Sequence, residues 1–225
     1  MPLKEPILFV NFKTYDEASG ENALKLAREA EQLSKQTKKT IALVVQALDL
    51  KEIARSVKIP IFAQHVDPID AGSNTGKIYP QAVRNAGATG TVLNHAENKL
   101  SNEILEKSIA KAKEVGLLVM VCAETVERAK QIASFSTKPD YIAIEPPELI
   151  GGNVSVSSAK PEIIVDTVKA VHAIAQIPII TGAGIKNGAD VRKAIGLGTM
   201  GVFVASGIVK APEPKKAVLE LLDGF

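Results

Sequence analysis

Three ionisable side chains, Lys13, His95 and Glu145, each come at or just after the end of a short apolar run. A carboxylate can take a proton from carbon, an imidazole can polarise a carbonyl, and an ammonium group can stabilise developing negative charge. Taken singly, each also has an ordinary structural explanation: a solvated lysine, a core histidine, or a strand-end glutamate in a salt bridge. A shared site therefore depends on the elements that carry them.

The segment after Glu145 is typical of a loop that closes over a site. Two prolines, at positions 146 and 147, follow the acid directly and disfavour helical backbone, so the chain leaves the strand stiff and extended. Leu149 and Ile150 then offer an apolar surface, and Gly151 and Gly152 provide a flexible end. This order predicts a lid that is rigid near the acid and hinged beyond it.

Small residues fill the turns after the last two apolar runs, which read TGAGI at 181–185 and VASG at 204–207. Small residues let backbone N–H groups approach an anion, and the loops after strands seven and eight are a common phosphate site in barrels. Glycine-rich turns are also common as simple connections between strands and helices. Two of them in these positions favour a phosphorylated substrate.

The elements that would position these residues are short apolar runs separated by segments with helical spacing. Most runs are continuously apolar, which indicates strands buried on both faces, as in a parallel sheet covered by helices. The predicted strands are Ile7–Phe12, Thr40–Val45, Pro60–Gln64, Gly90–Asn94, Leu117–Cys122, Tyr141–Glu145, Ile177–Thr181 and Met200–Ala205.

Helix start signals agree with this alternation. Ser101 precedes one helical stripe, Asn187 precedes another, and Pro161 and Pro214 fit first helical positions. Eight strand–helix units in 225 residues predict a single (β/α)8 TIM-barrel domain over 1–225. A doubly wound open sheet is the alternative, because alternation alone does not show closure.

Composition narrows the class of protein. A net charge of +2 with scattered lysines indicates no nucleic-acid or anionic-membrane surface. The lone cysteine, Cys122, suits a reducing compartment. No run approaches the ~18 apolar residues of a spanning helix, and the beginning of the chain has no secretory pattern. We therefore expect a cytoplasmic protein.

Four longer stretches carry a family resemblance: NFK at 11–13, AQHVDPIDAGSNTGKIYP at 63–80, GATGTVLNHAENK at 87–99 and IEPPELIGG at 144–152. With the two small-residue turns, they fall in the order and spacing of the triosephosphate isomerase family. The resemblance covers essentially the whole chain. Its most specific elements are the Asn-x-Lys, the His-x-Glu and the Glu-Pro lid, and the chain is most similar to the compact archaeal-type branch.

The resemblance implies interconversion of dihydroxyacetone phosphate and D-glyceraldehyde 3-phosphate through an enediolate, with no cofactor and no metal. It implies that Glu145 is the base, that His95 polarises the carbonyl as a neutral imidazole, and that Lys13, positioned by Asn11, supplies positive charge. Glu97 would either support these residues without touching the substrate or carry a proton.

The same resemblance makes Asn11 and Lys13 substrate-binding residues as well, and it places the phosphate against Ile150, Gly151, Gly184, Ala205 and Ser206. The chain departs from the commonest family pattern at several points. Alanine replaces serine after the histidine, the lid reads PPELIG, and the last two turns read GAGI and ASG. The seventh-strand turn thereby offers backbone where a serine hydroxyl is usual. These departures affect phosphate affinity and lid closure rather than the reaction.

The segment 67–79 is long and polar for a connection in a barrel. In the family this loop docks into a neighbouring subunit, where Thr75 would approach the neighbour's Asn11 and Lys13. The resemblance therefore implies a homo-oligomer with this loop at the dimer contact, and the compact branch implies a tetramer.

Two other classes of function fit a phosphate-binding barrel. An aldolase or a phosphate-dependent synthase would need a Schiff-base lysine or metal-binding carboxylates, and Lys13 is the only lysine that the pattern places at a barrel mouth. A non-catalytic sensor or scaffold would be expected to lack the acid or the histidine. The fold alone does not separate these classes, so the assignment depends on the site.

Overall fold

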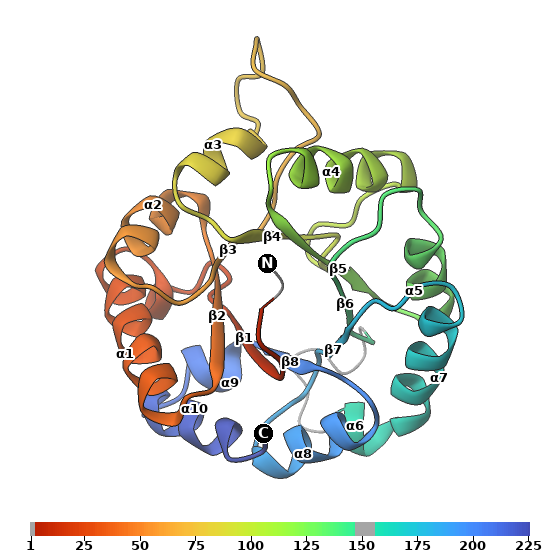
Figure 1. Ribbon diagram of the computed structural model, residues 1–225. Coiled ribbons are helices and arrows are strands. Elements are labelled where there is room, and N and C mark those ends of the chain that lie inside the picture. The colour runs from red at the N-terminus through yellow and green to blue at the C-terminus, as the bar shows by residue number, and fades with distance from the viewer. Residues whose placement is uncertain (1–2, 147–155) are drawn as a thin grey trace.

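Eight parallel strands form a closed barrel in the computed structural model, which describes residues 3–146 and 156–225 (Figure 1). The strands are Ile7–Asn11 (β1), Thr40–Val45 (β2), Ile61–Ala63 (β3), Gly90–Leu93 (β4), Leu118–Ala123 (β5), Tyr141–Ile144 (β6), Ile179–Thr181 (β7) and Gly201–Val204 (β8). Every apolar run predicted to be a strand forms one, with its ends shifted by at most two residues.

Closure of the sheet comes from the pairing of β1 with both β2 and β8. Ile7 lies opposite Thr40 on one side and opposite Gly201 on the other. The (β/α)8 TIM barrel is therefore confirmed, and the alternative of an open sheet is wrong. All eight strands run the same way, so their carboxyl ends meet at one mouth of the barrel.

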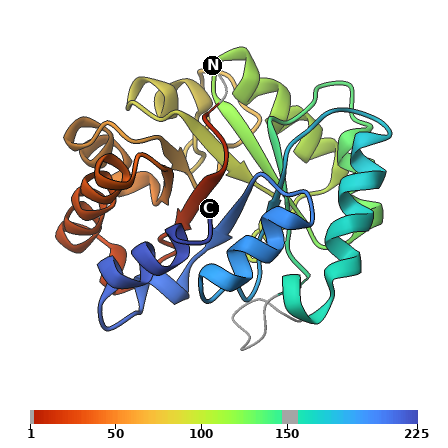
Figure 2. The same cartoon turned by 60° about the horizontal axis from the view of Figure 1, so that its bottom comes forward.

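Helices surround the barrel on its outside (Figures 1 and 2). They are Glu21–Thr37 (α1), Ala47–Ser56 (α2), Pro80–Asn85 (α3), Asn102–Glu114 (α4), Val126–Ala133 (α5), Val156–Ala159 (α6), Pro161–His172 (α7), Gly188–Gly196 (α8), Ser206–Val209 (α9) and Pro214–Leu222 (α10). The predicted start signals are confirmed. The Ser101 side chain caps α4, the Asn187 side chain caps α8, and prolines open α7 and α10.

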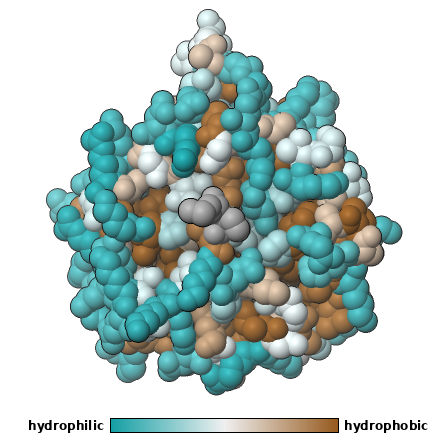
Figure 3. Space-filling model, in the orientation of Figure 1, coloured by the Kyte–Doolittle hydropathy of each residue, from teal (hydrophilic) through white to brown (hydrophobic). Residues whose placement is uncertain are grey.

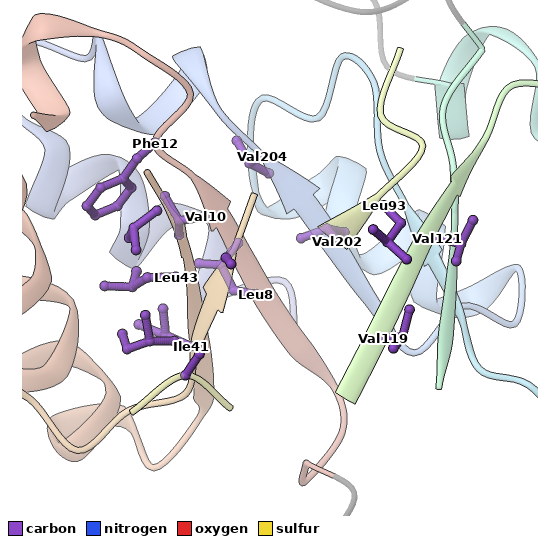
Figure 4. Close-up of a cluster of buried hydrophobic side chains, with 14 of the residues drawn as sticks. Leu8, Val10, Phe12, Ile41, Leu43, Leu93, Val119, Val121, Val202 and Val204 are labelled. Atoms are coloured by element: carbon purple, nitrogen blue, oxygen red, sulfur yellow. The ribbon is translucent and has the colours of Figure 1, made fainter. Parts of the chain in front are cut away.

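Strand side chains alternate between two apolar layers. Along β1, Leu8 and Val10 join the large cluster under the helices, together with Phe12 just beyond the strand (Figure 4). Ile7 and Phe9 point the other way, into the barrel interior. This alternation is what a pleated strand buried on both faces requires.

Aromatic rings fill much of the barrel interior. The Phe9 ring meets the rings of Phe62, Tyr141 and Phe203 edge-on, at centroid distances of 5.4, 5.7 and 6.5 Å. Edge-to-face contacts of this kind are favourable beyond the area they bury. The interior is therefore a packed core, and it supports the floor of the barrel mouth.

On the face shown in Figure 3, hydrophilic side chains cover most of the surface, with apolar residues showing between them. The connection between β3 and α3 projects from the barrel at the top of Figures 1 and 3. Within the described residues, no helix combines the length and the apolar character needed to cross a membrane.

Candidate active site

A cavity opens at the carboxyl ends of the strands. We call it the mouth cavity. Five strand ends contribute to it, those of β1, β4, β6, β7 and β8. Its lining residues are Asn11, Lys13, Tyr15, His95, Glu145, Ala183, Gly184, Ile185, Lys186, Phe203, Val204, Ala205, Ser206 and Gly207. The structure thus brings together all the predicted site residues that it describes, except Glu97.

The Lys13 backbone is held in an unusual conformation. Its φ of 48° lies in the left-handed region, which costs energy for a residue with a side chain. Two hydrogen bonds maintain it. The Lys13 N–H donates to Asn11 Oδ1 at 2.9 Å, and Gln64 Nε2 donates to the Lys13 carbonyl at 2.8 Å. Asn11 and Gln64 therefore fix the direction in which the lysine side chain leaves the strand.

The Lys13 ammonium lies close to the carboxylate of Glu97, in the segment that follows β4. Its Nζ is 2.6 Å from Glu97 Oε1, and only 13% of the Lys13 side chain is exposed, against 61% of the Glu97 side chain. The lysine is therefore no freely solvated surface residue. Glu97 stands outside the mouth cavity and faces a second cavity, which it shares with Asn11, Lys13 and His65. We call this the side cavity.

The contacts of His95 define its tautomer. The Glu97 backbone N–H donates to His95 Nδ1 at 3.2 Å, so Nδ1 carries the lone pair and, in the neutral ring, Nε2 carries the proton. Nε2 lies 3.9 Å from Glu145 Oε2, too far for a hydrogen bond. The ring also meets the Phe203 ring edge-on at 6.2 Å. A neutral imidazole thus presents an N–H donor to the mouth cavity.

Glu145 follows β6 directly, and its side chain is 7% exposed. Its Oε2 atom is buried without a hydrogen-bond partner in the described part of the chain. Burial raises the pKa of this carboxyl because the charged form loses water, while His95, the Cys122 thiol and the Lys13 ammonium oppose the shift. A buried carboxylate whose charged form is disfavoured in this way is a strong acceptor for a proton.

Space for the Glu145 side chain exists because its neighbour on β7 is glycine. A Cβ atom on Gly182 would stand 2.3 Å from Glu145 Cγ and 2.6 Å from Oε1. Atoms that are not bonded to each other do not approach this closely, so any other residue at 182 would displace the Glu145 side chain or the strand. Gly182, the first glycine of the TGAGI turn, therefore makes room for the Glu145 side chain rather than for a bound anion.

The rest of that turn and the start of α9 form the opposite wall. Ala183 and Gly184 both have positive φ, 69° and 72°, and consecutive residues of this kind can direct backbone N–H groups into a concavity. Ala205 and Ser206 continue the wall at the end of β8. The predicted phosphate residues Ile150 and Gly151, and with them the predicted lid, lie outside the described residues.

Four residues of this region were not named as site residues in the sequence-based prediction: Gln64, Cys122, Gly182 and Lys186. Gln64, Cys122 and Gly182 touch the site through residues far away in the chain. Lys186 lines the mouth cavity itself, so the expectation that Lys13 is the only lysine at the barrel mouth is wrong. Gln64 and Cys122 carried a signal, because each ends a predicted strand as Glu145 does. Among the described residues, no cluster of three or more His, Cys, Asp or Glu side chains is arranged to hold a metal ion.

Comparison with known proteins gives a consistent result. The family model described as triosephosphate isomerase matches residues 6–222. A triosephosphate isomerase of Methanothermus fervidus is 43% identical over 221 residues, which cover 98% of this chain and 99% of that protein. Those of Methanobacterium bryantii and Methanocaldococcus jannaschii are 45% and 42% identical, over 96% of this chain and 96% and 98% of theirs.

Proposed function

The chain belongs to the triosephosphate isomerase family, and we propose that Glu145, His95 and Lys13 carry out its reaction in the mouth cavity. The reaction interconverts dihydroxyacetone phosphate and D-glyceraldehyde 3-phosphate, a step of glycolysis and gluconeogenesis. The observation that carries the residue assignment is the joint presence, in one cavity, of a buried carboxylate with one oxygen left without a hydrogen bond by the described residues and of a neutral imidazole donor.

Proton transfer begins at Glu145. Its carboxylate removes a proton from the hydroxymethyl carbon of dihydroxyacetone phosphate and returns it to the neighbouring carbon, which was the carbonyl carbon. A carboxylate that burial has made more basic is suited to this carbon acid. Between the two transfers the substrate is an enediolate, whose negative charge lies on the oxygen atoms.

His95 and Lys13 stabilise that charge. The Nε2–H of His95 donates to the substrate oxygens, and a neutral donor matches the weak acidity of an enediol; this division of labour is the established one for the family. Lys13 adds a fixed positive charge from β1, and Asn11 holds its backbone. Glu97 supports both, since its carboxylate pairs with Lys13 and its N–H fixes the histidine.

The phosphate group lies against the wall made by the TGAGI turn and the start of α9. Gly184, Ala205 and Ser206 line the cavity there, and their backbone N–H groups would hold the phosphate, with Ile150 and Gly151 contributing from the proposed lid. Closure of the lid would exclude water, so that the enediolate is reprotonated before it loses phosphate. No cofactor or metal takes part in this scheme.

We also propose that the chain works as a homo-oligomer, a dimer through the loop 67–79 and a tetramer by analogy with the compact branch. The side cavity supports this, because it lies open beside Asn11 and Lys13 and offers room for the Thr75 loop of a second copy. Leu48, which is 94% exposed, follows Ala47, a residue of the lining of this cavity, and is an apolar side chain that such a contact would cover. The proposed compartment is the cytoplasm, where a free thiol such as that of Cys122 stays reduced.

The decisive experiment compares purified wild-type protein with the Glu145→Gln variant. Wild type should interconvert the two triose phosphates, and the variant should be slower by about three orders of magnitude or more, because the amide cannot accept the proton. Circular dichroism serves as the control for folding. Wild-type protein without turnover would refute the function, and a near-native variant would refute the assignment of the base.

A further inference from the structure

The charged groups around the mouth cavity supply too little positive charge to balance the negative charge of a phosphorylated substrate. The Lys13 ammonium is matched by the Glu97 carboxylate at 2.6 Å, so this pair adds little net charge. Glu145 must be a carboxylate to act as the base. A triose phosphate dianion would therefore enter a site whose remaining charge is negative, which is unfavourable in a partly enclosed cavity.

Lys186 supplies the missing charge. It lines the mouth cavity next to the TGAGI turn, on the wall where the phosphate is placed. Its backbone is fixed, because the Lys186 N–H donates to Asp190 Oδ2 at 3.0 Å at the start of α8. Its side chain is exposed at the rim, and among the described residues no carboxylate lies within ion-pair distance of its ammonium group.

The residues of the cavity wall around the β7 turn leave a role for a charged side chain such as that of Lys186. Gly184 has no side chain, so the β7 turn offers only backbone donors to an anion. Lys186 stands two residues further on and lines the same cavity. A lysine side chain is long and flexible, and it binds phosphate as a point charge without a demanding geometry.

We propose that Lys186 is a phosphate-binding residue, whose ammonium group contacts the phosphate dianion of the triose at the mouth of the cavity. The inference rests on the proposed function and adds a residue to it. Such a contact is present both with bound substrate and in the transition state. Its loss should therefore weaken binding and leave the chemical step almost unchanged.

The test is the Lys186→Gln variant, with Lys193→Gln as a matched control, because Lys193 is exposed on α8 and does not line the cavity. Inorganic phosphate is titrated into each protein and followed by calorimetry, which needs no turnover. The dissociation constant should rise about three- to fivefold for Lys186→Gln, as expected for one exposed ion pair, and stay at the wild-type value for Lys193→Gln. Lys186→Arg should restore most of the affinity.

Kinetics separate a contact with phosphate from a general disturbance. For the triose phosphates, KM should rise by about the same factor with kcat within about twofold, and for glyceraldehyde, which has no phosphate, kcat/KM should not change. An unchanged phosphate affinity in Lys186→Gln would overturn this inference and leave the isomerase assignment intact. Weaker phosphate binding in a protein without turnover would support Lys186 and refute the isomerase assignment.

Discussion

The Glu145 carboxylate has to be charged to act as a base, yet it lies where charge is costly. Its Oε2 atom has no hydrogen-bond partner among the described residues, and burial raises the pKa of the carboxyl. Functional sites commonly keep such a destabilising feature, because a carboxylate whose charged form is disfavoured is a stronger base. Lys13 shows the same principle in its backbone, since a left-handed residue is retained there by Asn11 and Gln64.

The raised pKa of Glu145 predicts how activity and stability depend on pH. Activity requires the carboxylate, so kcat/KM should fall on the acid side with an apparent pKa above that of an ordinary glutamic acid. In the window between its unfolded-state and folded-state pKa values, the folded protein binds more protons than the unfolded one. The free energy of unfolding contributed by this group therefore falls as pH rises through the window.

Denaturant unfolding of wild type and Glu145→Gln at about pH 8 and about pH 4.5 measures this contribution. The amide cannot ionise, so the variant should be more stable than wild type at the higher pH, by ~1 kcal/mol, and the advantage should shrink at the lower pH. A stability difference that is the same at both pH values would show that the acid is not destabilised by its charge.

At the scale of elements, the site depends on how closely neighbouring strand ends approach each other. β6 carries the acid, and β7 makes room for it with Gly182. β1 carries the lysine, and Gln64, just after β3, holds its carbonyl. No strand end forms the site alone, which explains why several turns with weak individual signals combine into one specific arrangement.

The Gly182→Ala variant tests this close approach. The added methyl group would overlap the Glu145 side chain, so kcat should fall by about tenfold or more as the acid moves by a fraction of an ångström. Gly196→Ala is the control, because a Cβ there meets nothing within 4 Å and the φ is not positive. Equal activity of the two variants would contradict the role given to Gly182.

At the scale of the whole molecule, one loop has the features expected of the proposed contact with a second copy. The loop 67–79 stands away from the barrel (Figure 1), and its base is tied by Asp67. The Asp67 carboxylate accepts the Ile78 N–H at 2.7 Å, and its own N–H donates to the Ile78 carbonyl at 2.9 Å. A projecting loop with a fixed base is suited to insertion into a partner.

The Thr75→Arg variant tests the proposed oligomer. Thr75 is exposed near the tip of the loop, and a long charged side chain there would not fit the side cavity of a partner beside Lys13. We expect a lower mass by light scattering and a large loss of kcat/KM. A neighbouring change outside the loop, Lys99→Gln, should leave the mass unaltered. An unchanged mass for Thr75→Arg would contradict the loop-mediated contact.

The sequence by itself determined the strands, their order, the helix starts and the types of residue at the strand ends. These are local properties: apolar runs, capping residues and prolines act over a few positions, so a pattern reveals them. For the same reason Lys13, His95 and Glu145 were identifiable from their places at the ends of runs. The small residues of the GAGI turn likewise predict an anion site from residue type alone.

Only the tertiary structure decided that β8 pairs with β1, that the Glu97 N–H sets the tautomer of His95, and that Gly182 yields space to Glu145. The same holds for the position of Lys186 on the cavity wall. Most of these contacts join residues that are far apart in the chain, and all depend on distances of a few ångströms. Periodicity and composition carry no such distances, because many three-dimensional arrangements share one pattern of apolar and polar residues.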